Sequence, residues 1–217
     1  MINDIKNAKK WLKKHDREYR EDKYSFYYKH EQLFVNSKYG VTISYQKLTQ
    51  IEVQFGTVDG FFDCSNNKLT SLLGSPHKVT QYFSCEYNKL NSLSYGPSDV
   101  GGNYICSYNK IKSLTNCPQV VLSHFICEGN PITNISKFNT QFKELFFHNT
   151  IDYKKIIPIL NNFYVEKEQN NNGKNLKYYE CILEYEELQN IIQAFNLYKK
   201  LNNQLSNEKN NTNKTKI

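Results

Sequence analysis

VTQYFSCEYNKLNSL, residues 79–93, decides the fold, because three neighbouring segments repeat its pattern at a fixed interval. These segments are VDGFFDCSNNKLTSL at 58–72, VGGNYICSYNKIKSL at 100–114 and VLSHFICEGNPITNI at 121–135. Each contains an aromatic residue, Cys two positions later, Asn three positions after Cys, and Leu or Ile two and five positions after Asn. A repeat of 21 residues is typical of a solenoid made of stacked coils.

The repeat predicts columns of buried residues. The aromatic residue and Cys alternate with a period of two, so both side chains should face one side of a short strand. Parallel strands of successive coils lie about 4.8 Å apart, which stacks equivalent residues. An amide donates and accepts hydrogen bonds, so the Asn column should satisfy backbone groups of its own turn and of the next coil. The three columns are Phe62, Phe83, Tyr104, Phe125; Cys64, Cys85, Cys106, Cys127; and Asn67, Asn88, Asn109, Asn130.

The pattern resembles the leucine-rich repeat, whose core is L-x-L-x-x-N-x-L. An aromatic residue and Cys stand here where two leucines are usual. Weaker coils are predicted at both ends, with Ile43 aligned to Cys64, and with Phe146 and His148 in the aromatic and cysteine columns. The expected fold is therefore α+β: a leucine-rich-repeat solenoid with short parallel strands on its concave face, an N-terminal helix and hairpin cap, and a C-terminal helical cap.

Four parts are expected along the chain: the N-terminal cap at 1–40, the repeats at 41–150, the C-terminal cap at 151–205 and a disordered tail at 206–217. Apolar residues at helical spacing predict an amphipathic helix from Asn3 to about Arg20, followed by a β-hairpin near 24–35. A basic helix that binds nucleic acid or membrane is an alternative for the first segment.

The C-terminal part is predicted to be mainly helical. We expect a short helix over Tyr153–Phe163, a polar loop over Glu166–Lys174, and a long helix from Tyr179 to about Leu205. The long helix should pack against the last coil, although its apolar stripe over Tyr179–Leu201 could instead form a homodimer. From Ser206 the chain is too polar to bury a core.

The six cysteines do not predict a metal site or a disulfide framework. Metal sites usually contain close pairs such as C-x-x-C, and this sequence has none. Column cysteines should point in parallel rather than toward one another, and Cys117 and Cys181 lie outside the column without an evident partner. None of the five histidines stands in a catalytic or phosphate-binding motif. We therefore expect no enzyme, no catalytic residue, no metal and no cofactor, and a reduced, cytoplasmic environment.

Residues that alternate with the buried columns should face a partner. Aromatic and isoleucine side chains are frequent at these outward positions, and such exposure is typical of protein interfaces. The alternative is that the hairpin or the C-terminal helix covers this surface. The predicted partner-binding residues are Tyr45, Phe61, Tyr82, Tyr87, Ile105, Tyr108, His124 and Ile126.

Residues from about 5 to 160 also resemble short leucine-rich repeat proteins encoded by bacteriophages, whose repeats read F-x-C-S-x-N-x-L-T-S-L-x-G-x-P. Residues 62–76, FDCSNNKLTSLLGSP, carry this resemblance. It implies a non-catalytic protein-binding module that acts inside a bacterial host, and inhibition of a defence system such as a CRISPR effector is the role we expect. A virion or assembly component is one alternative. A second alternative, which the net charge of +7 and the basic ends suggest, is a nucleic-acid binder or a protein that binds a ribonucleoprotein.

Overall fold

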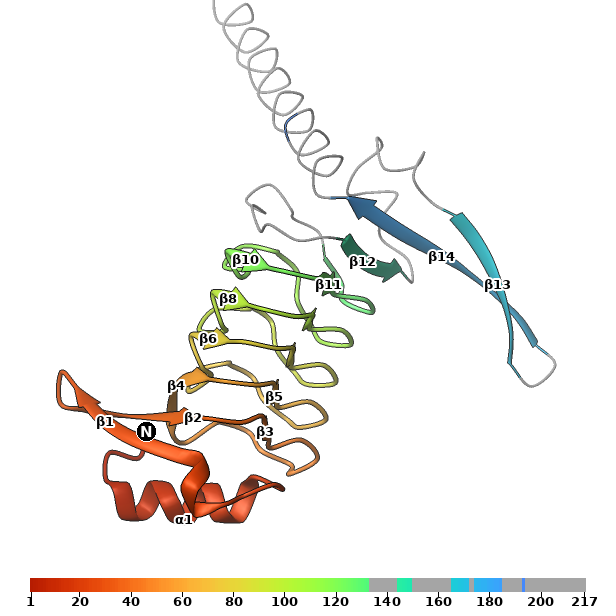
Figure 1. The fold of residues 1–217 in the computed structure, drawn as a ribbon. Coiled ribbons are helices and arrows are strands. Elements are labelled where there is room, and N and C mark those ends of the chain that lie inside the picture. Colours follow the sequence, from red (N-terminus) through yellow and green to blue (C-terminus); the bar gives the residue numbers. More distant parts are fainter. Residues whose placement is uncertain (133–143, 150–164, 172–173, 185–192, 194–217) are drawn as a thin grey trace, which may run out of the picture.

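The computed structural model describes residues 1–132, 144–149, 165–171, 174–184 and 193. These residues form a β-solenoid of about four turns with a period of about 21 residues (Figure 1). Each regular coil contributes one short strand to each of two sheets, so the chain turns a corner between them. The aromatic and Cys pattern predicted one strand in each coil, whereas each regular coil has two.

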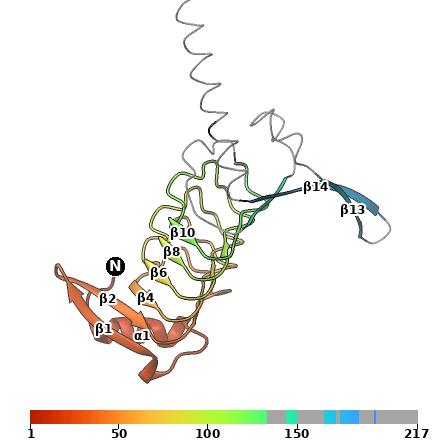
Figure 2. The ribbon, with the colours of Figure 1, turned by 45° about the horizontal axis from the view of Figure 1, so that its top comes forward.

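Sheet A contains a hairpin strand pair and one strand from each coil, in the order β1-β2-β4-β6-β8-β10. Its coil strands pair in parallel at a column of buried valines, and they lie one behind another in Figure 2. The valine column is the sequence signal for this sheet. The strands are β1 (Tyr24–Lys29), β2 (Gln32–Ser37), β4 (Gln54–Val58), β6 (Lys78–Val79), β8 (Asp99–Val100) and β10 (Val120–Val121).

Sheet B holds the aromatic and Cys segments, in the order β13-β14-β12-β11-β9-β7-β5-β3. From β3 to β12 the strands are parallel, and the pairing of Val41 with Phe62 places Ile43 beside Cys64 as predicted. The strands are β3 (Val41–Thr42), β5 (Phe62–Asp63), β7 (Phe83–Ser84), β9 (Tyr104–Ile105), β11 (His124–Ile126), β12 (Glu144–Asn149), β13 (Val165–Asn171) and β14 (Lys174–Glu184).

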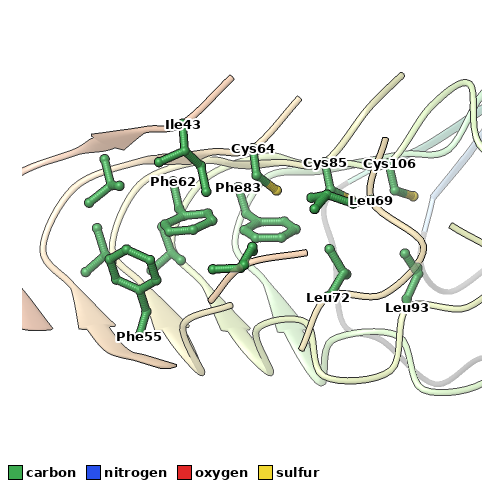
Figure 3. Close-up of a cluster of buried hydrophobic side chains, with 14 of the residues drawn as sticks. Ile43, Phe55, Phe62, Cys64, Leu69, Leu72, Phe83, Cys85, Leu93 and Cys106 are labelled. Carbon is green, nitrogen blue, oxygen red and sulfur yellow. The ribbon is translucent and has the colours of Figure 1, made fainter. Parts of the chain in front are cut away.

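The core follows the predicted columns. The rings of Phe62 and Phe83 stack in successive coils with centroids 5.9 Å apart, and Figure 3 shows them in the core beside Cys64 and Cys85. Tyr104 continues the stack, 5.0 Å from Phe83 and 5.2 Å from Phe125. The four column cysteines are almost completely buried, and burial raises the pKa of the Cys64, Cys85 and Cys106 thiols. These cysteines therefore act as small apolar residues.

The asparagine column ties each coil to the one before it. The Asn88 side chain donates to the carbonyls of Cys64 and Cys85, at 3.0 and 3.1 Å, and to that of Glu86 at 3.2 Å. Its Oδ1 accepts the backbone N–H of Leu69 at 2.9 Å. Asn67, Asn109 and Asn130 make equivalent bonds. The neighbour served is thus the preceding coil, whereas the sequence argument assigned it to the following one.

Helix α1 (Ile5–His15) lies at the N-terminal end of the stack in Figure 1. Asp4 accepts the backbone N–H of Asn7 at 2.8 Å and so begins the helix. The helix ends five residues earlier than predicted, because Asp16 leaves helical geometry and its buried carboxylate accepts from Lys23 Nζ at 2.7 Å and from Tyr24 Oη at 2.6 Å. These bonds join the end of α1 to the β1–β2 hairpin, whose turn residues His30 and Glu31 both have positive φ.

Two predictions for the C-terminal part are wrong. The segment predicted as a loop over Glu166–Lys174 is largely strand, and Tyr179–Glu184 belongs to β14 rather than to a helix. Antiparallel pairing decides this, because β13 pairs with the first part of β14, Lys174–Glu180, and β12 pairs with the last part, Tyr179–Glu184. Cys181 is therefore a strand residue. The predicted helix over 153–163, the tail and most of the predicted helix and dimer seam after residue 184 lie outside the described residues.

The alignment of the last coil is also corrected by one residue. Strand β12 places Leu145 opposite Phe125 and Phe146 opposite Ile126, so Phe146 does not continue the aromatic column. His148 likewise lies in this strand and not in the cysteine column. The spacing from Phe125 to its partner is thus one residue shorter than the regular repeat, and the Asn that fixes register in the other coils is missing there.

Candidate protein-binding face

We define the strand face as the outward residues of β3, β5, β7, β9 and β11, the outward residue directly before β5, β7 and β9, and the turn residue two positions after each cysteine or its equivalent. Side chains alternate between the core and the surface along each strand, so the outward ones reach this face. All the predicted partner-binding residues lie on this face. Tyr45, Tyr82, Tyr87 and Tyr108 are exposed, whereas Phe61, Ile105, His124 and Ile126 are half-buried.

Two aromatic pairs bridge successive coils on the strand face. The rings of Phe61 and Tyr82 stack with centroids 5.0 Å apart and planes 2° from parallel. The rings of Tyr87 and Tyr108 stack at 4.5 Å and 9°. Since each ring still exposes part of its surface, the pairs are preformed flat platforms rather than core packing. Tyr45 stands apart from them, because Asn66 occupies the intervening coil in its column.

The turn column has left-handed backbone geometry in every coil. Its φ values are 57° at Tyr45, 54° at Asn66, 51° at Tyr87, 53° at Tyr108 and 62° at Gly129. Gly and Asn adopt this geometry readily, but a bulky side chain such as Tyr does so at a cost. Gly129 has a second role, because a Cβ there would lie 2.6 Å from Cδ1 of Tyr108. The three tyrosines therefore occupy positions where folding alone favours a different residue.

An apolar strip and a histidine occupy the middle of the strand face. Ile105 and Ile126 are directly paired in β9 and β11, so the predicted side-by-side arrangement of the two isoleucines is present. The backbone N–H of His124 donates to Oδ1 of Asn103 at 3.2 Å. This bond ties His124 to the equivalent residue of the preceding coil. In the preceding two coils the isoleucine positions are taken by Asp63 and Ser84.

Three carboxylates, on Asp63, Glu86 and Glu128, lie among these aromatic residues, although the sequence argument did not select any of them. Burial and the charges of Asp63 and Glu128 raise the pKa of Glu86. Burial and the neighbouring Tyr87, Glu128 and Glu86 raise the pKa of Tyr108, and burial and Asp63 raise that of Tyr82. Their only sequence signal is position, since Glu86 and Glu128 immediately precede the turn column in alternate coils.

Within the described residues, no three His, Cys, Asp or Glu side chains are placed to hold a metal ion. No helix in the part of the chain that the structure describes is both long and apolar enough to span a membrane. The strand face offers a row of flat aromatic surfaces, an apolar strip and negative charge.

Comparison with family models, with curated protein sequences and with solved structures finds no matching family and no significant relative. The function is therefore inferred from the arrangement of this chain's own residues.

Proposed function

We propose that the protein is a non-catalytic protein-binding module whose partner binds the strand face. The two stacked aromatic pairs and the Ile105–Ile126 strip supply an apolar centre, and the surrounding Ser, Asn and carboxylate groups supply a polar margin. In protein interfaces, aromatic residues surrounded by a polar margin often contribute most of the binding affinity. The rings are already held by stacking, so little side-chain entropy is lost when a partner binds.

The tyrosines of the turn column carry this proposal. A left-handed backbone at a residue other than Gly or Asn costs about 1 kcal/mol or more, and such strain is concentrated at functional sites. Stacking of Tyr87 on Tyr108 returns a similar amount, about 0.5–1.5 kcal/mol. Exposed tyrosines at these positions thus bring folding little net benefit, while binding would explain all three.

We also propose that the coils are leucine-rich repeats and that α1 with the β1–β2 hairpin is an N-terminal cap. The asparagine ladder and the aromatic-x-Cys-x-x-Asn-x-Leu pattern support the first assignment, and the buried side chains of Ala8, Trp11 and Leu12 at the end of the core support the second. The resemblance to bacteriophage proteins suggests a host protein as partner, with inhibition of a bacterial defence system as the purpose.

The test is capture of partners from bacterial lysate by the immobilised full chain, with quantitative mass spectrometry. The triple variant Tyr87→Asn, Tyr108→Asn and Ile126→Ser should lose at least about nine-tenths of each specific partner, since central interface residues dominate affinity. Asn keeps the left-handed backbone unstrained, so this variant should fold.

The matched control is Tyr95→Asn. Tyr95 is also an exposed tyrosine with positive φ, at 69°, but it lies in the turn between β7 and β8, away from the strand face. It should capture the same partners as the natural chain. Equal recovery by the triple variant, with its folding verified by circular dichroism, would contradict the proposed function.

A further inference from the structure

The charge of the strand face is opposite to that of the chain. The protein has a net charge of +7, and Lys and Arg make up 28 of its 217 residues. The five segments that form the face, 40–45, 61–66, 82–87, 103–108 and 124–129, contain no Lys or Arg, although about half of their residues are not buried. They do contain Asp63, Glu86 and Glu128, so the face is a negative patch on a positive protein.

Among the residues that the structure describes, no basic side chain forms an ion pair with these carboxylates. The ion pairs found in the described residues join Arg20 to Asp22, Lys23 to Asp16 and Lys78 to Asp99, and none of them involves the strand face. Exposed lysines of the coils follow the turn column by two residues, at Lys47, Lys68, Lys89 and Lys110. The pKa of Glu86 is nevertheless raised, by burial and by the neighbouring negative charges of Asp63 and Glu128.

Carboxylates beside tyrosine rings form a recognised environment for a cation. A guanidinium or ammonium group is attracted to the face of an aromatic ring and to a carboxylate at its edge. The chain itself contains this arrangement elsewhere: the Arg20 guanidinium lies 4.5 Å from the centroid of Tyr39, and its Nε is 3.6 Å from Asp22. On the strand face the rings of Tyr87 and Tyr108 lie close enough to Glu86 and Glu128 that, with burial, these carboxylates raise the pKa of Tyr108, which is the same combination of groups.

We infer that the strand face receives a basic segment of its partner, with an arginine or lysine side chain over the Tyr87–Tyr108 pair and beside Glu86 and Glu128. This inference rests on the proposed function and names the chemistry of the partner. A positive charge there relieves the repulsion among Asp63, Glu86 and Glu128, whereas a phosphate backbone would add to it. The negative patch therefore favours a basic polypeptide over a nucleic acid as the occupant of this face.

The experiment measures fluorescence anisotropy of dye-labelled peptides titrated with the full chain at about 50 mM and 300 mM salt. One probe is a Gly/Ser decapeptide carrying four arginines, and the second has citrulline in place of each arginine, which keeps the shape without the charge. A dye-labelled oligothymidylate is the third. We expect the arginine peptide to bind at least about tenfold more tightly than either of the other probes, with the difference shrinking at high salt.

Two double variants separate a local effect from net charge. Glu86→Gln with Glu128→Gln should weaken binding of the arginine peptide about tenfold, whereas Glu21→Gln with Asp22→Asn, which removes the same charge from an exposed site, should change it less than about twofold. Equal weakening by the two variants, or equal binding of the arginine and citrulline peptides, overturns the inference. Tighter binding of the oligothymidylate that is lost in Tyr87→Asn/Tyr108→Asn also overturns it, in favour of a nucleic acid. The proposed function fails separately, by unchanged partner capture in the tyrosine and isoleucine triple variant.

Discussion

The inward and outward columns of the same strands differ in how strictly they repeat. Inward, the residues are Phe, Phe, Tyr and Phe in one column, and four Cys and four Asn in the next two. Outward, equivalent positions hold Phe61, Tyr82, Asn103 and His124, or Asp63, Ser84, Ile105 and Ile126. Every coil buries its inward residues against the same neighbours, so folding imposes one solution, whereas the outward residues of each coil meet a different environment.

This contrast separates what the fold needs from what it carries. A buried column tolerates little change in volume or hydrogen bonding, because its neighbours above and below are close-packed. An outward residue such as Tyr87, whose φ of 51° strains the backbone, is not explained by folding and needs a functional explanation. Perturbations of the two kinds of column should therefore have effects of very different size, and the following experiments measure that difference.

The largest effect is expected from alkaline pH acting on the inward cysteines. Burial raises the pKa of Cys64, Cys85 and Cys106 above the ordinary value of 9.0, so these thiols stay protonated in the native state. In the unfolded chain they lose protons above about pH 9, the native state then binds more protons, and stability falls as pH rises. Burial also raises the pKa of Cys117, and the four thiols together give a slope of about 5 kcal/mol per pH unit, measurable by urea unfolding between pH 8 and 10.5.

A double variant distinguishes the thiols from other groups that titrate in this range. Cys64→Ala with Cys106→Ala lowers the starting stability, but it should reduce the slope above pH 9 by about half, because Cys85 and Cys117 remain. An unchanged slope in the double variant would show that groups other than the inward column control alkaline unfolding.

The second largest effect is expected at the asparagine column. Asn88→Ala leaves the Leu69 N–H and the carbonyls of Cys64 and Cys85 short of buried partners, so the free energy of unfolding should fall by about 3–5 kcal/mol. Asn91→Ala, three residues along at an exposed position, should change it by less than about 0.5 kcal/mol. Equal melting temperatures for the two variants would remove the structural role assigned to the column.

The inward columns were predictable because folding repeats them, and the errors fall where that repetition stops. Sheet A has one constrained residue per coil, the valine, which is too little to indicate a strand by alternation. After residue 135 the Asn column ends, and nothing in the sequence fixes the register that pairs Leu145 with Phe125.

The C-terminal hairpin had a local signal that the helix prediction outweighed. Asn172 and Gly173 separate β13 from β14, and Asn-Gly between β-forming segments favours a two-residue hairpin connection. The apolar residues from Ile182 onward also fit a helical spacing, and only the pairing of β14 with β12 and β13 decides between the two for Tyr179–Glu184. On the strand face, the aromatic positions followed from alternation, but Glu86 and Glu128 could not be selected because no rule of the fold requires them.

A smaller effect, a gain in stability, is expected at Tyr104, where the aromatic column has Tyr in place of Phe. The Tyr104 hydroxyl is buried without a hydrogen-bond partner among the described residues, although it lies near the weakly accepting Cys85 thiol. Tyr104→Phe should therefore stabilise the protein by about 1 kcal/mol in urea unfolding. Tyr24→Phe is the contrasting variant, because its buried hydroxyl donates to Asp16 at 2.6 Å, and its loss should destabilise by about 1.5–3 kcal/mol. Destabilisation by both variants would show that Tyr104 has a partner.

The smallest effect on stability is expected on the strand face. Tyr87→Asn with Tyr108→Asn removes a stacked pair worth about 0.5–1.5 kcal/mol and relieves two left-handed tyrosines at a similar gain, so the free energy of unfolding should change by less than about 1 kcal/mol. The same variant should lose the partner, which no inward variant of equal stability would do. A loss of several kcal/mol here, comparable to Asn88→Ala, would mean that the tyrosines are part of the folding columns, and the distinction between inward and outward residues would no longer identify a binding surface.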